Sequence, residues 1–350
     1  MNYENFKHSI NWKSKNIFLV DMTKEIDLYF SQLVHRWIEK YAKEWKKIWI
    51  IVNKKWYSAW FICKDCGYIP QCDNCSVSIT YHKLAWQEDF GMCHICKKQY
   101  NLPKKCSNCW SEKIKWFGIW TQKVAEFIKS EFGLDSLIIE SEKVNSPNKI
   151  KKIVEKKSDY NIFIWTSLLS TQIKNFPFDL IIFLNADMGL NIPDYTSSET
   201  NFNLLYDTFK GHDCENYIVQ SFNVNQYSIR SACKLSKSEF FDVDNKFRKE
   251  HNYPPFTDIC IVLYKNEIEQ RLFNSVDKLY KELLFLKEKY EMKELEIYST
   301  PPLVYKKFGK FRYNVILKWK DLRNFMDIVY SKLNLSARWF KIDRQADSIV

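Results

Sequence analysis

Long apolar segments are absent from this sequence of 350 residues. Its first residues, MNYENFKHSINWKSKN, lack the apolar core that an export signal needs. Further along, the chain has no apolar run of the ~18 residues that would indicate a transmembrane helix. These absences argue against a membrane span and a cleaved leader, so we expect a soluble, cytoplasmic protein.

Glycine is scarce, whereas tryptophan is abundant. The chain has 7 glycines, although an average share of about 7% would give roughly 25. It has 13 tryptophans, normally the rarest residue. We hypothesise that many of these tryptophans are glycines in the native protein, as happens when a UGA codon that the organism reads as glycine is translated as tryptophan. The alternative is a protein that is truly rich in tryptophan.

Basic residues moderately outnumber acidic residues. Lys and Arg number 53 and Asp and Glu number 42, so the formal net charge is +11. This excess favours a polyanionic partner without requiring one, because net charge affects association rather than fold. The hydrophobic share of 46% allows a substantial core, and the length suits about two or three domains.

The part of the chain up to about residue 223 alternates between apolar strands and amphipathic helices. Thr23 is a plausible N-cap of the first helix. Alternation of this kind predicts an α/β layer with a parallel sheet, interrupted by a cysteine-rich block. The expected strands are 16–22, 47–53, 136–141, 160–167, 180–187 and 216–222, and the expected helices are 23–44, 121–132, 148–157 and 197–209.

The character of the sequence changes at about residue 224. Residues 226–250 read as one long helical stretch, which Pro254 and Pro255 bring to an end. The remainder predicts a small α+β domain of βαββαβ order. Its expected elements are strand 258–264, helix 267–290, strand 295–299, strand 311–318, helix 320–332 and strand 338–343.

Eight of the eleven cysteines form four CxxC pairs. Each pair can present two thiolates on a tight knuckle, and two knuckles complete a tetrahedral zinc site. Four knuckles therefore predict two structural zinc sites, each saturated by sulfur; the alternative is redox pairs or loose thiols. Gly67 follows the first knuckle where a left-handed residue relieves strain, and Trp110 follows the last knuckle in the equivalent place. The ligands would be Cys63, Cys66, Cys72, Cys75, Cys93, Cys96, Cys106 and Cys109.

The sequence resembles the primosomal protein N′ (PriA) family of replication-restart DNA helicases. The likeness begins at CKDCGYIPQCDNCSVSITYH and extends to FLVDMTKE, FGIWTQKVAEF, IFIWTSLL, LNADMGLNIPDY, FRKEHNYPPF, TPPLVYKKFGKFRYNVILK and IDRQADSIV. It covers about 16 to 350, and Trp56, Trp120 and Trp165 stand where the family has glycine.

The resemblance implies a RecA-like second helicase lobe with an inserted two-zinc module and a C-terminal α+β domain. The implied boundaries are 1–62 for the start of the lobe, 63–109 for the zinc insertion, 110–223 for the rest of the lobe and 224–350 for the C-terminal domain. The two zinc sites would be nested. The outer site would use Cys63, Cys66, Cys106 and Cys109, and the inner site Cys72, Cys75, Cys93 and Cys96.

Features of a working motor are missing. The chain has neither a GxxxxGK[ST] loop nor a DEAH-like box, which the first lobe of a helicase supplies. The family's arginine-finger segment corresponds to DTFKGHDC (207–214), where Lys210 is the only cation. A lysine cannot reproduce the planar, bidentate guanidinium. We therefore assign no catalytic or cofactor-binding residue and expect no ATP hydrolysis by this chain alone.

A basic stretch at 303–318 interleaves cations with aromatic residues. Cations can follow phosphates while aromatic rings stack on unpaired bases. The alternative is a solvated basic hairpin whose aromatic side chains alternate into the core. The candidate DNA-binding residues are Lys306, Lys307, Phe308, Lys310, Phe311, Arg312, Tyr313 and Lys318.

The functional expectation is a PriA-like restart factor that holds two zinc ions and binds forked or single-stranded DNA without motor activity of its own. Candidate partners are the single-strand-binding protein and other primosome or helicase-loading proteins. The first alternative is an ATP-dependent 3′–5′ helicase whose first lobe is on a separate chain or missing from the gene model. The second is a zinc-stabilised scaffold that never touches DNA.

Overall fold

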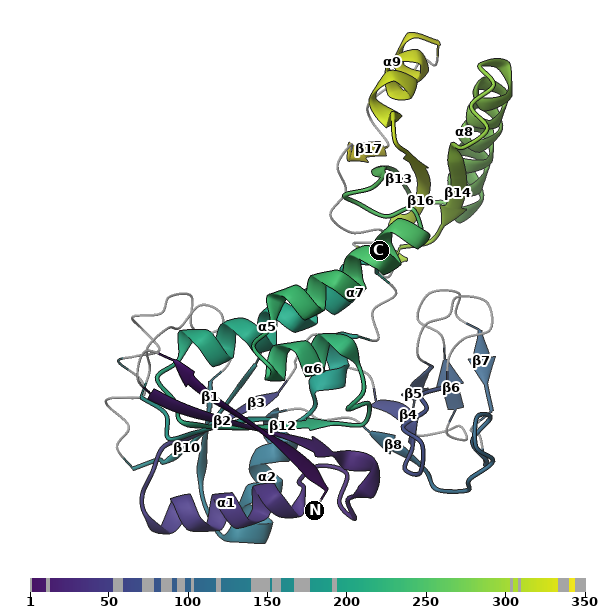
Figure 1. Cartoon of the computed structure of the whole chain (residues 1–350). Coiled ribbons are helices and arrows are strands. Elements are labelled where there is room, and N and C mark those ends of the chain that lie inside the picture. Colours follow the sequence, from purple (N-terminus) through teal and green to yellow (C-terminus); the bar gives the residue numbers. More distant parts are fainter. Residues whose placement is uncertain are drawn as a thin grey trace.

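Described elements of this computed structural model form three sheets (Figure 1). The largest is a seven-stranded sheet, and each of the other two has five strands. Figure 1 places the C-terminal sheet at the far end of the long helix α7. The structure describes residues 2–10, 13–52, 59–70, 79–82, 90–92, 98–101, 104–117, 121–139, 152, 159–166, 177–190, 194–302, 305–307, 310–332 and 340–343.

The seven-stranded sheet has the order β1-β2-β12-β11-β3-β10-β9. All neighbouring pairs from β2 to β9 are parallel, as the alternation of strands and helices predicts, and only β1 runs antiparallel to its neighbour. Its strands are β1 (Tyr3–Ile10), β2 (Lys13–Asp21), β3 (Ile48–Val52), β9 (Ser136–Ile139), β10 (Ile162–Thr166), β11 (Leu180–Phe183) and β12 (Asn216–Ser221).

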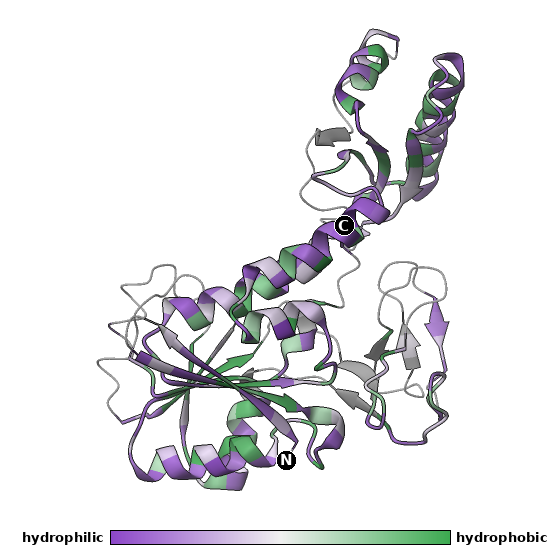
Figure 2. Cartoon of the chain, in the orientation of Figure 1, coloured by the Kyte–Doolittle hydropathy of each residue, from purple (hydrophilic) through white to green (hydrophobic). Residues whose placement is uncertain are grey.

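Helices cover both faces of this parallel sheet, and its central strands β3 and β11 are apolar and buried along their whole length (Figure 2). α1 (Gln32–Lys43) and α2 (Thr121–Phe132) pack on one face. α5 (Ser197–Gly211), α6 (Tyr227–Cys233) and the start of α7 (Lys237–Glu250) pack on the other. Successive side chains of a strand point to opposite faces, so each strand contributes to both cores.

The first helix is shorter than predicted. The sequence predicts one helix over 23–44 capped by Thr23, but α1 begins at Gln32, and Ser31 is its N-cap. Residues 22–24 form only a short 3-10 turn, η1 (Met22–Lys24), which Asp21 caps. Side chains that accept hydrogen bonds from backbone N–H groups compete with helix formation here; for example, the N–H of Tyr29 donates to Asp27 Oδ1 (2.6 Å).

The helical stretch predicted over 226–250 is also divided in two. Leu235 adopts a left-handed conformation (φ 54°) between α6 and α7. Ser236 then caps α7, because its hydroxyl accepts a hydrogen bond from the backbone N–H of Glu239 at 3.2 Å. A residue in the left-handed region cannot continue the helix, so the stretch breaks at this point.

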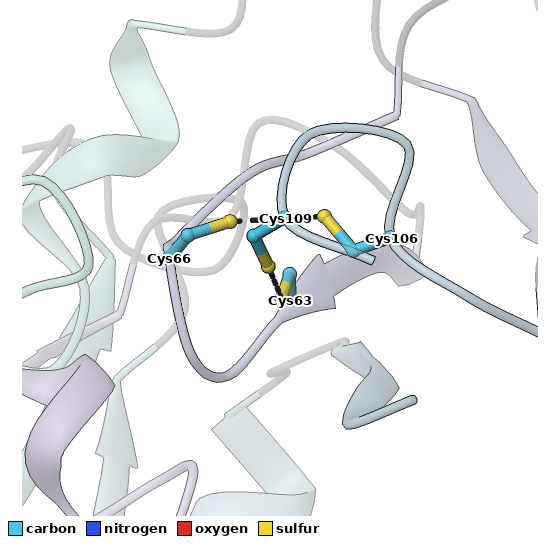
Figure 3. A group of neighbouring side chains, drawn as sticks. All are labelled: Cys63, Cys66, Cys106 and Cys109. Atoms are coloured by element: carbon cyan, nitrogen blue, oxygen red, sulfur yellow. Dashed lines mark hydrogen bonds between the residues drawn. The ribbon is translucent and has the colours of Figure 1, made fainter. Parts of the chain in front are cut away.

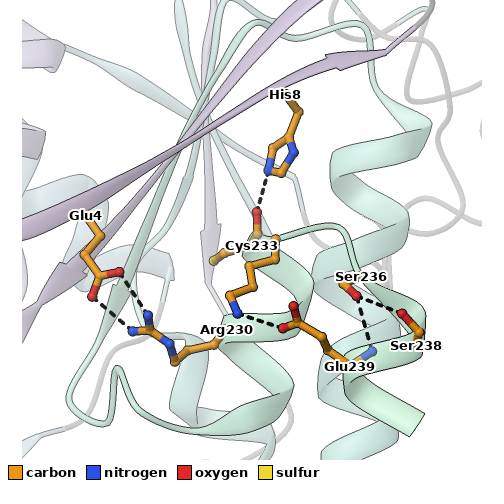
Figure 4. A network of polar contacts seen from close by, with 8 residues as sticks. Glu4, His8, Arg230, Cys233, Ser236, Ser238 and Glu239 are labelled. Carbon is orange, nitrogen blue, oxygen red and sulfur yellow. Dashed lines mark hydrogen bonds and ion pairs between the residues drawn. The ribbon is translucent and has the colours of Figure 1, made fainter. Parts of the chain in front are cut away.

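The edge strand β1, which sequence periodicity did not predict, is tied to α6 by side chains (Figure 4). Arg230 donates two hydrogen bonds of 3.0 Å to the Glu4 carboxylate, which holds the pKa of Glu4 below its usual range. His8 Nε2 lies 2.8 Å from the carbonyl oxygen of Cys233. These contacts fix the strand against the end of the helix.

The cysteine-rich block forms an antiparallel sheet of its own between β3 and α2. Its order is β7-β6-β5-β4-β8, so the first and last strands of the block pair with each other. The strands are β4 (Ala59–Cys63), β5 (Thr80–His82), β6 (Phe90–Met92), β7 (Gln99–Tyr100) and β8 (Ile114–Phe117).

The C-terminal sheet is antiparallel, with the order β14-β16-β13-β17 and a short β15 beside β16. The βαββαβ order is the one that the sequence predicts, with β15 added. Helices α8 and α9 lie on one face of the sheet over an apolar core. The elements are β13 (Asp258–Asn266), α8 (Glu269–Lys289), β14 (Glu296–Thr300), β15 (Lys306–Lys307), β16 (Lys310–Trp319), α9 (Leu322–Lys332) and β17 (Phe340–Asp343).

Two expectations stay open at the level of the fold. The helix predicted over 148–157 lies outside the described residues, apart from Lys152. The boundary expected at 223/224 stays a prediction, and Ile229 of α6 and Phe240 of α7 lie in the core of the parallel-sheet unit. Among the described helices, none combines the length and apolar content needed to cross a membrane.

Candidate metal centre and basic hairpin

Two cysteine knuckles meet at the base of the inserted sheet. β4 ends at Cys63, which pairs with Ile114 at the start of β8, so the strand pair brings residues 63–66 and 106–109 together. In each knuckle, the backbone N–H of the residue after the second cysteine donates to the carbonyl of the first: Gly67 to Cys63 and Trp110 to Cys106, both at 2.9 Å. The two turns therefore have the same geometry.

The four sulfur atoms of these knuckles lie within 4.8 Å of one another (Figure 3). Sγ of Cys63 is 3.5 Å from Sγ of Cys109, and Sγ of Cys66 is 3.7 Å from Sγ of Cys106. A tetrahedral zinc ion with Zn–S bonds of ~2.3 Å needs sulfur separations of about 3.8 Å. The described knuckles therefore form one four-cysteine cluster that could hold zinc, with every coordination position taken by sulfur.

Neighbouring groups favour the thiolate form of one cysteine of this cluster, Cys66. Burial raises the pKa of Cys66, but hydrogen bonds from the backbone N–H of Tyr68 and the side chain of Asn108 outweigh it and lower the pKa to about 7. Asn108 Nδ2 lies 3.6 Å from this sulfur, and its backbone N–H donates to Cys106 at 3.4 Å. Such contacts orient metal ligands and are part of most metal sites.

Asp65, inside the first knuckle, joins it to the second. Its carboxylate accepts hydrogen bonds from Ser111 Oγ (2.5 Å) and Lys113 Nζ (3.1 Å). The Ser111 hydroxyl and the Lys113 ammonium hold the pKa of Asp65 below its usual range. The two knuckles are thus tied together beside the sulfur atoms.

Lys64 docks the first knuckle on the parallel-sheet unit. Its side chain is buried, and its ammonium donates to the backbone carbonyls of Met22 (3.1 Å), Glu25 and Asp27 (3.4 Å). Gly67 presses against the same unit, since a Cβ there would lie 2.5 Å from the carbonyl oxygen of Phe222. The contacted residues lie just beyond the ends of β2 and β12, at the carboxyl edge of the sheet.

No pattern in the sequence pointed to the docking role of Lys64. Spacing identifies the cysteines, but it does not tell whether a residue between them points to solvent or to another part of the fold. The second predicted ligand set, Cys72, Cys75, Cys93 and Cys96, lies outside the described residues.

The basic stretch forms the hairpin of β15 and β16, and strand register divides its residues between two faces. Phe311 and Tyr313 pack against the core beneath α8 and α9. Lys310 and Arg312 occupy the alternate positions of β16, and Arg312 pairs with Lys265 of β13. The register also pairs Lys307 with Lys310, and Lys306 with Phe311. The cationic positions 265, 307, 310 and 312 therefore share the face away from the helices.

Two of the predicted aromatic side chains of the hairpin, Phe311 and Tyr313, point toward the core, as in the alternative stated from the sequence. Phe311 contacts Tyr305, with 5.6 Å between ring centroids, and Tyr313 contacts Phe273 at 5.4 Å. Both aromatics are partly buried. Phe308 lies outside the described residues.

Lys318, the last predicted cation, is buried. Its Nζ donates to the carbonyl of His251 at 3.0 Å, lies 3.4 Å from Glu296 and sits 4.1 Å from the centre of the Tyr253 ring. Lys310, in contrast, is partly exposed, and its ammonium lies 3.7 Å from Glu267. The hairpin thus has a partly exposed basic end at Lys310 and a buried end at Lys318.

The segment that the resemblance matches to the arginine finger, residues 207–214, begins in the last turn of α5 and runs past its end. Phe209 is fully buried, and the Lys210 ammonium lies 5.8 Å from the centre of the Tyr206 ring. Just beyond the helix lies a cavity of about 440 Å³, whose lining includes the acidic residues Asp179, Asp213 and Glu215 and the basic residues Lys13 and Lys46. The Lys13 ammonium pairs with Asp213, so charges of both signs meet at this cavity.

Comparison with known proteins gives a consistent result. No protein-family model matches the chain. Replication restart protein PriA of Borreliella burgdorferi is 29% identical over 318 residues, which are 87% of this chain and 46% of the relative. The Bacillus subtilis PriA is 28% identical, covering 90% and 40%, and the Thermotoga maritima PriA is 26% identical, covering 97% and 45%.

The chain is a homologue of PriA over most of its length. It spans less than half the length of these three PriA relatives. The resemblance noted from the cysteine knuckles and the YPPF segment is therefore confirmed as homology to a portion of PriA.

Proposed function

We propose that this chain acts in replication restart by binding branched or single-stranded DNA. PriA homology over most of the chain supports the process. The observation that supports DNA binding is the row of cations at 265, 307, 310 and 312 on the helix-free face of the C-terminal sheet. Such a row can follow a phosphate backbone.

Two features of the architecture belong to the same proposal. The parallel-sheet unit would be a RecA-like second helicase lobe, because its strands and its inserted cysteine block occur in the order that the PriA resemblance implies. Cys63, Cys66, Cys106 and Cys109 would hold one zinc ion, and Cys72, Cys75, Cys93 and Cys96 a second.

The chain would have no motor activity of its own. Lys210 stands where the resemblance places the family's arginine finger, and a lysine cannot reproduce the bidentate guanidinium. An ATP-dependent 3′–5′ helicase whose first lobe comes from another polypeptide is the alternative. We further propose a cytoplasmic location, with single-strand-binding protein and helicase-loading proteins as partners.

Fluorescence anisotropy with a labelled fork and a labelled oligothymidylate tests DNA binding. Lys307→Glu combined with Lys310→Glu should weaken binding at least about tenfold. Lys278→Glu combined with Lys281→Glu is the matched control, because these exposed lysines lie on α8, which covers the other face. Equal affinities of the two double variants would reject the basic row as the binding surface.

An ATPase assay separates the proposal from its alternative. The purified chain should show no DNA-stimulated ATP hydrolysis. Hydrolysis by the chain alone would overturn the proposal, whereas hydrolysis that needs a separate polypeptide with a P-loop would establish the split helicase. Metal analysis of the same sample should find two zinc ions per chain.

We also propose that Trp110, Trp120 and Trp165 are glycine in the native protein, decoded from UGA. Trp110 has a left-handed backbone (φ 61°) and an exposed side chain. Trp165 is buried, and its indole Nε1 has no hydrogen-bond partner among the described residues. Mass spectrometry of tryptic peptides from the source organism decides the matter: tryptophan masses at these positions would refute the proposal.

A further inference from the structure

A buried arginine organises the place where α7 reaches the C-terminal sheet (Figure 1). The Arg248 guanidinium donates to Asp244 Oδ2 (2.6 Å), Glu199 Oε2 (2.7 Å) and the carbonyl oxygen of Pro254 (3.1 Å). It thereby joins α5, α7 and the YPPF segment. A planar guanidinium suits this role, since it presents several donors in fixed directions.

Aromatic rings continue from this arginine to the C-terminal sheet. Arg248 lies over the ring of Tyr195, 5.2 Å from its centre. Tyr195 stacks on Tyr253 with 4.9 Å between centroids and an angle of 10°. The ammonium of Lys318, from β16, lies 4.1 Å from the centre of the Tyr253 ring. We call these four residues the stacked joint.

The stacked joint connects two parts that have separate apolar cores. Tyr195 belongs to the parallel-sheet unit, just before α5, whereas Lys318 belongs to the C-terminal sheet. Ile259, Ile261 and Ile316 of the C-terminal sheet form a small apolar core with Tyr195. Glu296, 3.4 Å from Lys318, balances the buried ammonium.

The stacked joint and the basic row share one face of the C-terminal sheet. Residues 310, 312, 316 and 318 occupy alternate positions of β16, so the open cations are at one end of this face and Lys318 is at the other. Any rotation of the sheet at the stacked joint would move the basic row relative to the parallel-sheet unit.

We infer that Lys318 and Tyr253 are positioning residues, which hold the basic row at a fixed distance from the parallel-sheet unit so that one branched DNA contacts both. Lys318 then acts through the Tyr253 ring and not as a phosphate ligand. The functional part of this inference rests on the proposed DNA binding. A rigid connection raises the effective concentration of the second contact once the first is made.

Two measurements on the full chain test the inference. Dyes introduced through non-natural residues at Lys40 of α1 and Lys281 of α8, both exposed, report the distance between the units. Lys318→Met and Tyr253→Leu should broaden the distance distribution and weaken fork binding at least about tenfold. Their affinity for a short oligothymidylate, which needs the basic row alone, should stay unchanged.

Conservative variants separate this role from general destabilisation. Tyr253→Phe keeps the ring and should behave as the unaltered chain. Lys320→Met removes the same charge from an exposed neighbour and should leave both readouts unchanged. Far-UV circular dichroism confirms that each variant is folded.

Three results would overturn the inference. The first is an unaltered distance distribution in Lys318→Met, and the second is a loss in Tyr253→Phe equal to that in Tyr253→Leu. The third is a loss of oligothymidylate affinity in Lys318→Met, which would make Lys318 a phosphate ligand. Failure of the unaltered chain to bind DNA would reject the proposed function. The distance distribution would still show whether the stacked joint holds the two units at a fixed separation.

Discussion

Two tryptophans occupy backbone positions that normally belong to glycine. Trp45 follows α1 with φ 52°, and its N–H donates to Ala42 while that of Lys46 donates to Tyr41. This is the hydrogen-bond pattern of a Schellman motif, whose left-handed residue is usually glycine. Trp110 likewise has a left-handed backbone after a cysteine knuckle, with its side chain 77% exposed. An exposed tryptophan recovers little packing energy in return for the strain.

We predict that Trp45→Gly stabilises the parallel-sheet unit. A side chain in the left-handed region costs about 1–2 kcal/mol, whereas glycine adds about 0.5–1 kcal/mol of unfolded-state entropy. The free energy of unfolding should therefore rise by about 0.5–1 kcal/mol, measured by urea denaturation. Trp45→Ala keeps the strained Cβ and is the control. A glycine variant no more stable than the alanine variant would contradict the prediction.

The sequence identified the cysteine ligands but not the residues that act between them. CxxC spacing indicated metal binding, and the resemblance to PriA implied that Cys63, Cys66, Cys106 and Cys109 belong to one site, as the structure groups them. Lys64 became informative only when the fold brought it against the carbonyls of residues 22–27. For Lys318 the sequence pattern pointed to DNA binding, whereas the fold buries this cation beside Tyr253.

Elements with a clear period were predicted well, and the exceptions have local causes. The strands of the parallel sheet and α2 stand out because burial dictates their apolar pattern. The segment before α1 and the break before α7 depend on side-chain caps by Ser31 and Ser236, which periodicity does not reveal. Edge strand β1 is held by the Glu4–Arg230 pair, a contact across 226 residues.

The first knuckle should stabilise the segment before α1, so that loss of their contacts opens this segment. Lys64→Met removes the hydrogen bonds to three carbonyls and should cost about 2 kcal/mol in local opening, which makes tryptic cleavage after Lys24 about 30-fold faster. Zinc content should stay unchanged, and removal of zinc by a chelator should expose the same bond. Peptide mapping of timed digests measures both effects.

Lys113→Met is the control for this prediction. Lys113 lies just after the second knuckle, but its ammonium is exposed and pairs with Asp65 at the surface. Surface pairs contribute less than about 1 kcal/mol, so cleavage after Lys24 should change little. Cleavage of Lys64→Met at the rate of the unaltered chain would show that the knuckle and the segment are independent.

At the scale of the whole molecule, the sequence predicted the units but not their connection. The α/β and α+β patterns each follow from local periodicity. The stacked joint draws residues 195, 248, 253 and 318 together from separate elements, and nothing in their spacing marks them as neighbours. Contacts of this kind depend on the fold of both units.

The whole molecule should bind DNA with a salt dependence set by the basic row. Each phosphate contact to single-stranded DNA contributes about 0.7 to the slope of log affinity against log salt concentration. Lys307→Gln combined with Lys310→Gln should therefore reduce the magnitude of that slope by about 1.4 for oligothymidylate, measured by anisotropy over a salt series. Lys318→Met should leave the slope unchanged because its ammonium is buried against Tyr253. An unchanged slope in the double variant would mean that the phosphates lie elsewhere on the molecule, since charge removed from a real contact must release fewer counterions.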